Sequence, residues 1–178
     1  EFFDKHFKLR KLETISFNSF SELVNIKEYG YTYMLNKITA GDGNLGSGDG
    51  WHRDSPISPQ YKAILYLTDV TESNGPFQYL PKSNSVENII EIANILGSKL
   101  SDYRYTDDNI DKLLGNGFEI KTFKAKKGTL ILADTRGIHR GKTIEENYRI
   151  ALTRYNFYRK PSKSLGLAKI NLGKGIFK

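Results

Sequence analysis

Two of the chain's three histidines lie in segments that could hold a metal ion. His52 and Asp54 form an H-x-D tripeptide, and His139 follows much later in the chain. On an extended strand the side chains of residues i and i+2 point the same way, so His52 and Asp54 could reach one ion. Two imidazoles and one carboxylate on one face of an ion form the ligand set of non-haem Fe(II) oxygenases, which leaves positions open for a cosubstrate and O2. We therefore predict that His52, Asp54 and His139 bind one divalent metal ion as the catalytic centre. Fe(II) fits this ligand set, and imidazole ligands also suit Zn, Cu and Ni.

An arginine in a predicted strand could supply the cosubstrate site. Arg149 follows His139 in the segment YRIALTRY, where strand alternation places Arg149 on one face and Arg154 on the other. A guanidinium group can hold a carboxylate through two parallel hydrogen bonds. We predict that Arg149 binds a cosubstrate carboxylate, with Arg154 as the rival candidate. Tyr33, on a predicted strand before the H-x-D, is a further candidate contact.

The remaining sequence predicts a mainly β protein. β-rich segments bounded by turn residues predict strands over 31–38, 61–70, 77–80, 118–125, 129–133 and 148–158. Residues 41–50 are glycine-rich and predict a loop that leads into the H-x-D, whereas residues 84–116 show helical spacing. Among β architectures we favour a double-stranded β-helix, the jelly-roll or cupin-like fold, because residues from different strands converge at its mouth. We expect a single domain over residues 1–178, with a core at 31–158, a helical insertion at 84–116 and flanking helices.

The composition is that of a folded globular chain. The 178 residues are 38% hydrophobic and 26% charged, and they include no cysteine, which excludes disulfides and thiolate metal sites. No apolar run is long enough to span a bilayer, so we expect a cytoplasmic protein without a membrane partner. The net charge of +7 is explained by solubility or by attraction to an anionic partner.

Taken in order, four segments resemble the phytanoyl-CoA dioxygenase family of Fe(II)/2-oxoglutarate-dependent oxygenases. The segments are the H-x-D at 52–54, the stretch NGPFQYLPKSN at 74–84, the distal His139, and Arg149 in R-x-A-L. The resemblance covers roughly residues 31–158. The sequence departs from the family pattern at Lys82, where glycine is usual, and at Asn84, where histidine is usual.

The resemblance implies a hydroxylase that uses Fe(II), 2-oxoglutarate and O2 on a small-molecule substrate. Arg149 would hold the distal carboxylate of 2-oxoglutarate. Asp54 occupies the ligand position that related halogenases leave free for a halide, which indicates hydroxylation. Gly141 stands where many members carry a serine that helps to hold the same carboxylate. Another group must therefore take that role here.

Two alternative functions are compatible with the residues. A cupin-like metal enzyme that does not use 2-oxoglutarate would keep the three ligands without needing Arg149. A non-enzymatic basic β-domain would use lysines, arginines and tyrosines to bind nucleic acid or glycan. We expect a small polar metabolite or carbohydrate as the substrate and not nucleic acid, and the sequence leaves the oligomeric state open.

Overall fold

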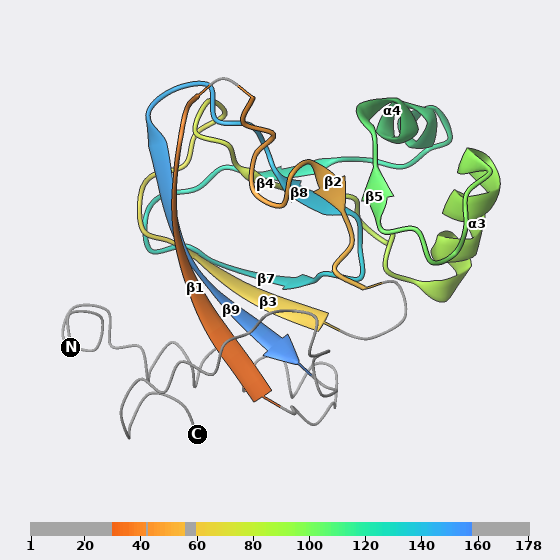
Figure 1. The fold of residues 1–178 in the computed structure, drawn as a ribbon, viewed down its shortest axis with the longest axis horizontal. Helices are drawn as coiled ribbons and strands as arrows, with labels where there is room; N and C mark the ends of the chain where they lie inside the picture. Colours follow the sequence, from red (N-terminus) through yellow and green to blue (C-terminus); the bar gives the residue numbers. More distant parts are fainter. Residues whose placement is uncertain (1–29, 42, 56–59, 158–178) are drawn as a thin grey trace.

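Two antiparallel sheets face each other in the computed structural model, which describes residues 30–41, 43–55 and 60–157 (Figure 1). The first sheet has the order β1-β9-β3-β7, formed by β1 (Gly30–Thr39), β9 (Tyr148–Phe157), β3 (Gln60–Tyr66) and β7 (Leu130–Asp134). The second has the order β5-β2-β8-β4-β6, formed by β5 (Arg104–Tyr105), β2 (Trp51–His52), β8 (His139–Gly141), β4 (Phe77–Tyr79) and β6 (Lys121–Phe123). The predicted jelly roll is therefore confirmed.

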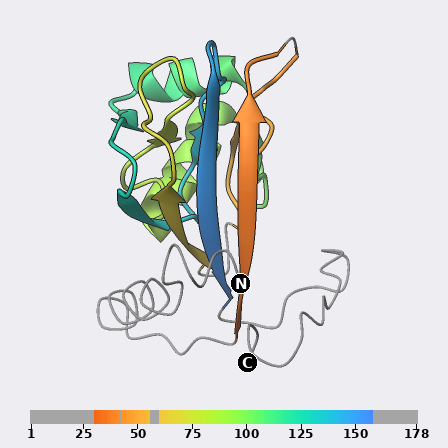
Figure 2. The same ribbon diagram turned by 90° about the vertical axis from the view of Figure 1, so that its left-hand side faces the viewer.

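The first sheet is built from the long strands that the sequence predicted. β9 pairs with β1 along its whole length and with β3 on its other side, so it is a central strand (Figure 2). The predicted strand over 118–125 is shorter than expected, because regular pairing is confined to Lys121–Phe123 and Ala125 forms only an isolated bridge with Val70. The flanking helices that the sequence analysis expected lie outside the described residues.

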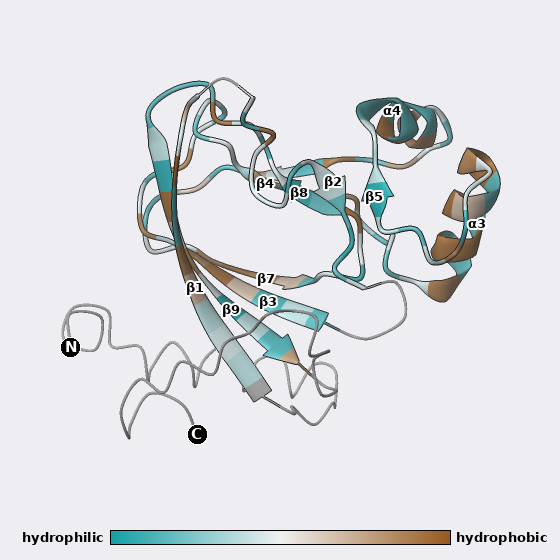
Figure 3. Ribbon diagram, viewed as in Figure 1, coloured by the Kyte–Doolittle hydropathy of each residue, from teal (hydrophilic) through white to brown (hydrophobic). Residues whose placement is uncertain are grey.

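Between the sheets lies an apolar core, with brown segments along β7 in Figure 3. Its buried members are Ile64, Tyr66, Val70, Phe77, Ile131 and Ala133. Tyr66 crosses from the first sheet to the second: its hydroxyl donates to the Phe123 carbonyl at 3.1 Å and accepts from the Phe77 amide at 2.9 Å. The buried hydroxyl is thus satisfied twice and ties the two sheets together.

The helical insertion contains α3 (Val86–Leu96) and α4 (Asp107–Gly115). Ser85 caps the start of α3, and Thr106 and Asn109 form a capping box at the start of α4. A second buried cluster joins these helices to the face of the second sheet that points away from the first. Its members are Trp51, Leu80, Ile92, Ile110, Leu113 and Ile138. Full burial of side chains of this size contributes about 1.5–3 kcal/mol each.

A polar contact fixes α4 on that sheet. Asp107, in the first turn of α4, accepts from Trp51 Nε1 at 3.1 Å and from Arg140 Nη1 at 3.0 Å. The Arg140 guanidinium also lies over the Trp51 ring, 4.3 Å from its centroid. The insertion therefore packs on the outer side of β2 and β8, and leaves their inner side to the cavity described below.

Among the helices of the described residues, none is long and apolar enough to cross a membrane.

Candidate active site

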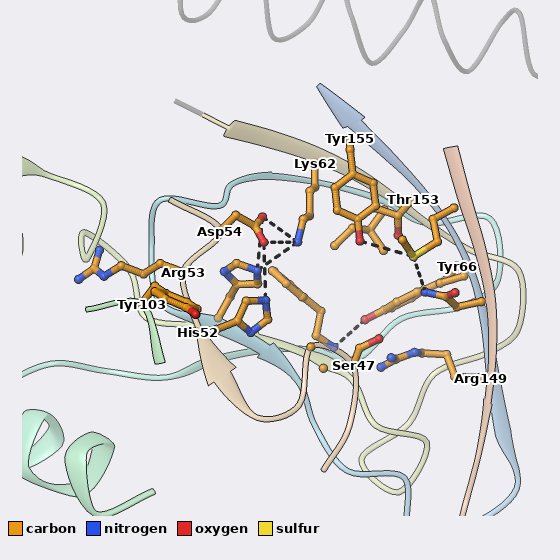
Figure 4. A pocket seen from close by; sticks show the side chains of 18 of the residues that line it. Ser47, His52, Arg53, Asp54, Lys62, Tyr66, Tyr103, Arg149, Thr153 and Tyr155 are labelled. Atoms are coloured by element: carbon orange, nitrogen blue, oxygen red, sulfur yellow. Dashed lines mark hydrogen bonds and ion pairs between the residues drawn. The ribbon is translucent and has the colours of Figure 1, made fainter. Parts of the chain in front are cut away.

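A cavity of about 440 Å³ opens between the two sheets, a size typical of small-molecule sites. Its lining includes Lys62, Ile64 and Tyr66 of β3, four residues of β9, and His139 and Gly141 of β8. The loop before β2 contributes Ser47 and Gly48, and the insertion contributes Tyr103 and Arg104. Side chains from distant parts of the sequence thus converge on one space (Figure 4).

His52, Asp54 and His139 come together on the wall formed by β2 and β8. His52 and His139 are directly paired across the two strands, with ring centroids 4.3 Å apart. Nε2 of His52 lies 3.7 Å from Asp54 Oδ1, and Nε2 of His139 lies 3.9 Å from Asp54 Oδ2. The potential ligand atoms of the three residues all lie within 4.8 Å of one another. The structure therefore assembles the donor set that the sequence predicted, and His139 belongs to a strand of its own, separate from β7.

Both imidazoles are held in the neutral form, with the lone pair of Nε2 free for a metal ion. Nδ1 of His52 lies 2.9 Å from the Gly50 carbonyl, and Nδ1 of His139 lies 2.9 Å from the Gly137 carbonyl. A carbonyl only accepts, so each Nδ1 carries the proton and each Nε2 lone pair faces Asp54. Burial lowers the pKa of His52, and it lowers the pKa of His139 to about 3. Both rings are neutral near pH 7, as metal ligands must be.

Asp54 is ionised and shares its carboxylate with Lys62, a residue that the sequence analysis missed. The Lys62 ammonium lies 2.9 Å from Oδ1 and 2.7 Å from Oδ2 of Asp54, and 3.4 Å from His139 Nε2. Burial alone would raise the pKa of Asp54, but the charge of Lys62 and hydrogen bonds from Lys62 and Thr135 hold it below its ordinary value. One anionic carboxylate and two neutral imidazoles fit a divalent ion such as Fe(II).

Arg53, between the two H-x-D residues, points away from them (Figure 4). Its side chain is only 2% exposed. Nη1 donates to the carbonyls of Ser83 at 2.5 Å and Arg136 at 2.7 Å, and Nε donates to the Tyr105 hydroxyl at 2.8 Å. These bonds anchor the outward side of the segment, so that His52 and Asp54 face the cavity.

Arg149 lies in the cavity, on the same face of β9 as Ala151, Thr153 and Tyr155. Its side chain is 5% exposed, and within the described part of the chain it forms no ion pair or hydrogen bond. Burial lowers its pKa, which reflects the cost of holding this cation out of water. A buried, unpaired guanidinium beside a cavity is suited to an anionic ligand.

Arg154 and Tyr33 lie elsewhere. Arg154 is on the other face of β9, where Nη1 donates to Asn156 Oδ1 at 2.5 Å and the guanidinium covers the Tyr31 ring at 4.2 Å. Tyr33 is opposite Arg154 in the β1–β9 register, whereas the cavity is lined by Met34 and Asn36 of β1. The structure therefore does not bring Tyr33 into the cavity, and we do not retain it as a cosubstrate contact.

The signal for Lys62 was present in the sequence, because a lysine in the apolar strand segment YKAILYLTDV is unusual. Tyr155 lies on the same face of β9 as Arg149 and also lines the cavity. Its ring lies 4.7 Å from the Lys62 ammonium, and burial raises the pKa of its hydroxyl to about 12, so this group stays protonated.

Among solved structures, the chain is similar to the non-haem α-ketoglutarate-dependent epimerase SnoN from nogalamycin biosynthesis. The TM-score is 0.58 at 15% identity, over 94% of this chain and 65% of that one. A second structure of SnoN, in complex with Fe3+, α-ketoglutarate and nogalamycin RO, gives a TM-score of 0.52 at 12% identity, over 81% of this chain and 57% of that one. The α-ketoglutarate-dependent carbocyclase SnoK from nogalamycin biosynthesis gives 0.51 at 14% identity, over 82% and 57%. At these identities the similarity concerns the fold, and the chain spans less than two thirds of these proteins.

A comparison with curated proteins gave no match. The sequence does match the family profile described as Phytanoyl-CoA dioxygenase (PhyH), over residues 6–145. This match covers most of the chain, including the H-x-D and the distal histidine. The chain therefore belongs to the phytanoyl-CoA dioxygenase family.

Proposed function

We propose that this protein is an Fe(II)/2-oxoglutarate-dependent dioxygenase that hydroxylates a small polar metabolite or a carbohydrate-type substrate, and that residues 1–178 belong to one such domain. One observation carries the proposal: the His52–Asp54–His139 cluster lines the same cavity as Arg149, whose guanidinium has no ion pair or hydrogen bond among the described residues. The first group suits a divalent ion and the second suits a carboxylate. Membership of the phytanoyl-CoA dioxygenase family supports this pairing.

In this proposal each residue has a defined task. His52, Asp54 and His139 hold Fe(II), which when bound supplies the activation of O2. Arg149 holds the distal carboxylate of 2-oxoglutarate in a two-bond clamp and so orients the molecule along the cavity. The balanced reaction converts 2-oxoglutarate, O2 and a C–H bond into succinate, CO2 and an alcohol. The sheets exclude bulk water around the reacting groups.

The cavity lining supports a polar substrate. Arg104 and Tyr103 lie at the insertion side of the cavity, and Lys62 lies beside the three candidate metal ligands. Asp54 is the only acidic residue among the lining residues in the described part of the chain. A substrate with hydroxyl or anionic groups would complement this surface better than an apolar one.

Both alternatives account for fewer of these features. A metal enzyme that does not use 2-oxoglutarate leaves the buried charge of Arg149 without a partner among the residues that the structure describes. A β-domain that binds nucleic acid or glycan does not explain why the three potential metal ligands converge.

Calorimetry under argon, with Mn(II) as a redox-inert substitute for Fe(II), tests the cosubstrate site. We expect 2-oxoglutarate to bind the unmodified protein and to bind Arg149→Ala at least about 100-fold more weakly, because two charge-assisted hydrogen bonds are lost. Arg149→Lys should recover only part of the lost affinity, since lysine keeps the positive charge but cannot form the two parallel hydrogen bonds of a guanidinium group. Arg154→Ala is the matched control. If Arg154→Ala lost binding while Arg149→Ala bound 2-oxoglutarate fully, Arg154 and not Arg149 would be the arginine that holds the carboxylate.

The metal and the reaction need separate measurements. Iron analysis of His52→Ala and His139→Ala should show loss of bound iron, because each variant removes one of three protein ligands. Stoichiometric iron in both variants would refute the ligand assignment. Succinate release in air, screened over a metabolite panel, would then identify the substrate.

A further inference from the structure

The space beside Gly141 is occupied by a side chain from another segment. Gly141 is the last residue of β8 and faces the cavity. A Cβ atom added to it would lie 2.6 Å from Ser47 Cβ and 2.9 Å from Arg149 Nη2. A side chain at position 141 would therefore point into the corner between Ser47 and Arg149. Ser47 fills this corner from the glycine-rich loop, next to the guanidinium (Figure 4).

The loop lies so close to β8 because its glycines allow it. The Gly141 amide donates to the Ser47 carbonyl at 3.0 Å. Gly46, at φ +85°, has no room for a Cβ, which would lie 2.0 Å from the Gly141 carbonyl oxygen. Gly48, at φ +86°, would place a Cβ 2.1 Å from His52 Cε1. The segment 46–48 thus packs against a candidate metal ligand at one end and against the candidate carboxylate site at the other.

The Ser47 hydroxyl is available to a ligand. It lines the cavity, and no residue in the described part of the chain forms a hydrogen bond with it. A carboxylate has about four lone-pair sites, and a guanidinium clamp uses two of them. A hydroxyl next to that clamp can therefore donate a third, charge-assisted hydrogen bond.

We propose that Ser47 is a second anchor for the anion held by Arg149, and that it supplies from the loop the hydroxyl that β8 lacks at Gly141. The inference rests on the proposed function, in which that anion is the distal carboxylate of 2-oxoglutarate. The loop is then part of the cosubstrate site, and its position against β8 depends on bound cosubstrate as well as on its own hydrogen bonds.

The test measures 2-oxoglutarate binding calorimetrically to the Mn(II)-loaded full chain. Ser47→Ala should weaken binding about 10- to 100-fold, since one hydrogen bond to a charged group is lost. Ser101→Ala, at an exposed serine, is the matched control and should bind like the unmodified protein. Affinity for 2-oxobutyrate, which keeps the 2-oxo acid end but lacks the second carboxylate, should be the same in Ser47→Ala as in the unmodified protein.

An exchange of the two residues separates the hydroxyl from the loop backbone. Ser47→Gly and Gly141→Ser should each bind 2-oxoglutarate weakly, the first because the hydroxyl is gone and the second because the new Cβ meets Ser47 Cβ, a contact that Ser47→Gly removes. The double variant Ser47→Gly/Gly141→Ser restores a hydroxyl to the same corner, and should recover to within about 10-fold of the unmodified protein. Thermal melting of all variants would identify one that does not fold.

The outcomes distinguish a failure of the proposed function from a failure of the role proposed for Ser47. If the unmodified protein does not bind 2-oxoglutarate, or if Arg149→Ala binds it normally, the proposed function fails and this inference fails with it. If Arg149→Ala loses binding while Ser47→Ala keeps it, only the role of Ser47 is overturned. The role of Ser47 is also overturned if the double variant binds 2-oxoglutarate no more tightly than Ser47→Gly does. The same holds if Ser47→Ala loses as much affinity for 2-oxobutyrate as for 2-oxoglutarate.

Discussion

Replacing Lys62 with methionine removes a buried cation from the edge of the candidate metal site while keeping most of the side-chain volume. The Lys62 ammonium lies 2.7–2.9 Å from both oxygens of Asp54 and 3.4 Å from His139 Nε2. A divalent ion bonded to these atoms at about 2.1 Å would lie within about 5 Å of the ammonium group. The two cations therefore repel each other at the same carboxylate.

The repulsion can be estimated from Coulomb's law. Charges of +1 and +2 at about 5 Å repel by about 2 kcal/mol at the dielectric constant of water, and by about 7 kcal/mol at an effective value of 20. The attraction between Lys62 and Asp54 is present with and without the ion, so it largely cancels in the binding free energy. Since about 1.4 kcal/mol corresponds to a factor of ten, Lys62→Met should bind a divalent ion at least about tenfold more tightly.

Competition between the protein and a coloured chelator for Mn(II) or Co(II) measures this affinity. Lys112→Met, at an exposed position of α4, changes the net charge equally and should leave the affinity unchanged. The metal-free Lys62→Met protein should also be less stable by about 3 kcal/mol, because Asp54 loses its buried partner. Weaker metal binding by Lys62→Met would refute the reasoning, and would mean that Lys62 serves the metal by orienting Asp54.

Three further predictions follow from the same region. Arg53→Met should lower the free energy of unfolding by about 3 kcal/mol, because the carbonyls of Ser83 and Arg136 lose their buried donor; an unchanged urea midpoint would contradict this. The pKa of His139 is about 3 in the folded protein against an ordinary value of 6.5, so below pH 6.5 only the unfolded chain takes up this proton. The metal-free protein should therefore lose up to about 1.4 kcal/mol of stability per pH unit as the pH falls from 6.5, measured by urea titrations at pH 7 and pH 5. In the proposed function Asp54 fills the ligand position that a halide would need, so products formed in high chloride should gain one oxygen by mass spectrometry, and chlorine incorporation would refute hydroxylation.

The sequence predicted the strands β1, β3 and β9 because they are long and contain many β-branched and aromatic residues. It predicted the shorter β7 because its segment, LILAD, is apolar. In β9, alternation alone placed Arg149 and Arg154 on the correct opposite faces. The choice of candidate metal ligands was also limited, because a chain with only three histidines offers few sets of two imidazoles and one carboxylate.

The second sheet was harder to predict because its strands are very short and carry functional residues. β2 consists of Trp51–His52 and β5 of Arg104–Tyr105, too short for any periodic pattern. Their pairing depends on contacts with distant segments and not on local propensity. For the same reason the proximity of Ser47 to Gly141 could not be read from the sequence, since it arises from the path of a loop across a strand.

β8 separates two environments within three residues. His139 and Gly141 face the cavity, whereas Arg140 faces the helical insertion and reaches Asp107. The insertion also has its own apolar cluster, distinct from the one between the sheets. Substitutions in α3 and α4 should therefore disturb the candidate metal ligands little, provided that the contacts of Arg140 and Trp51 persist. The insertion can then be exchanged or redesigned as a separate unit, with the candidate metal site left on the opposite side of β8.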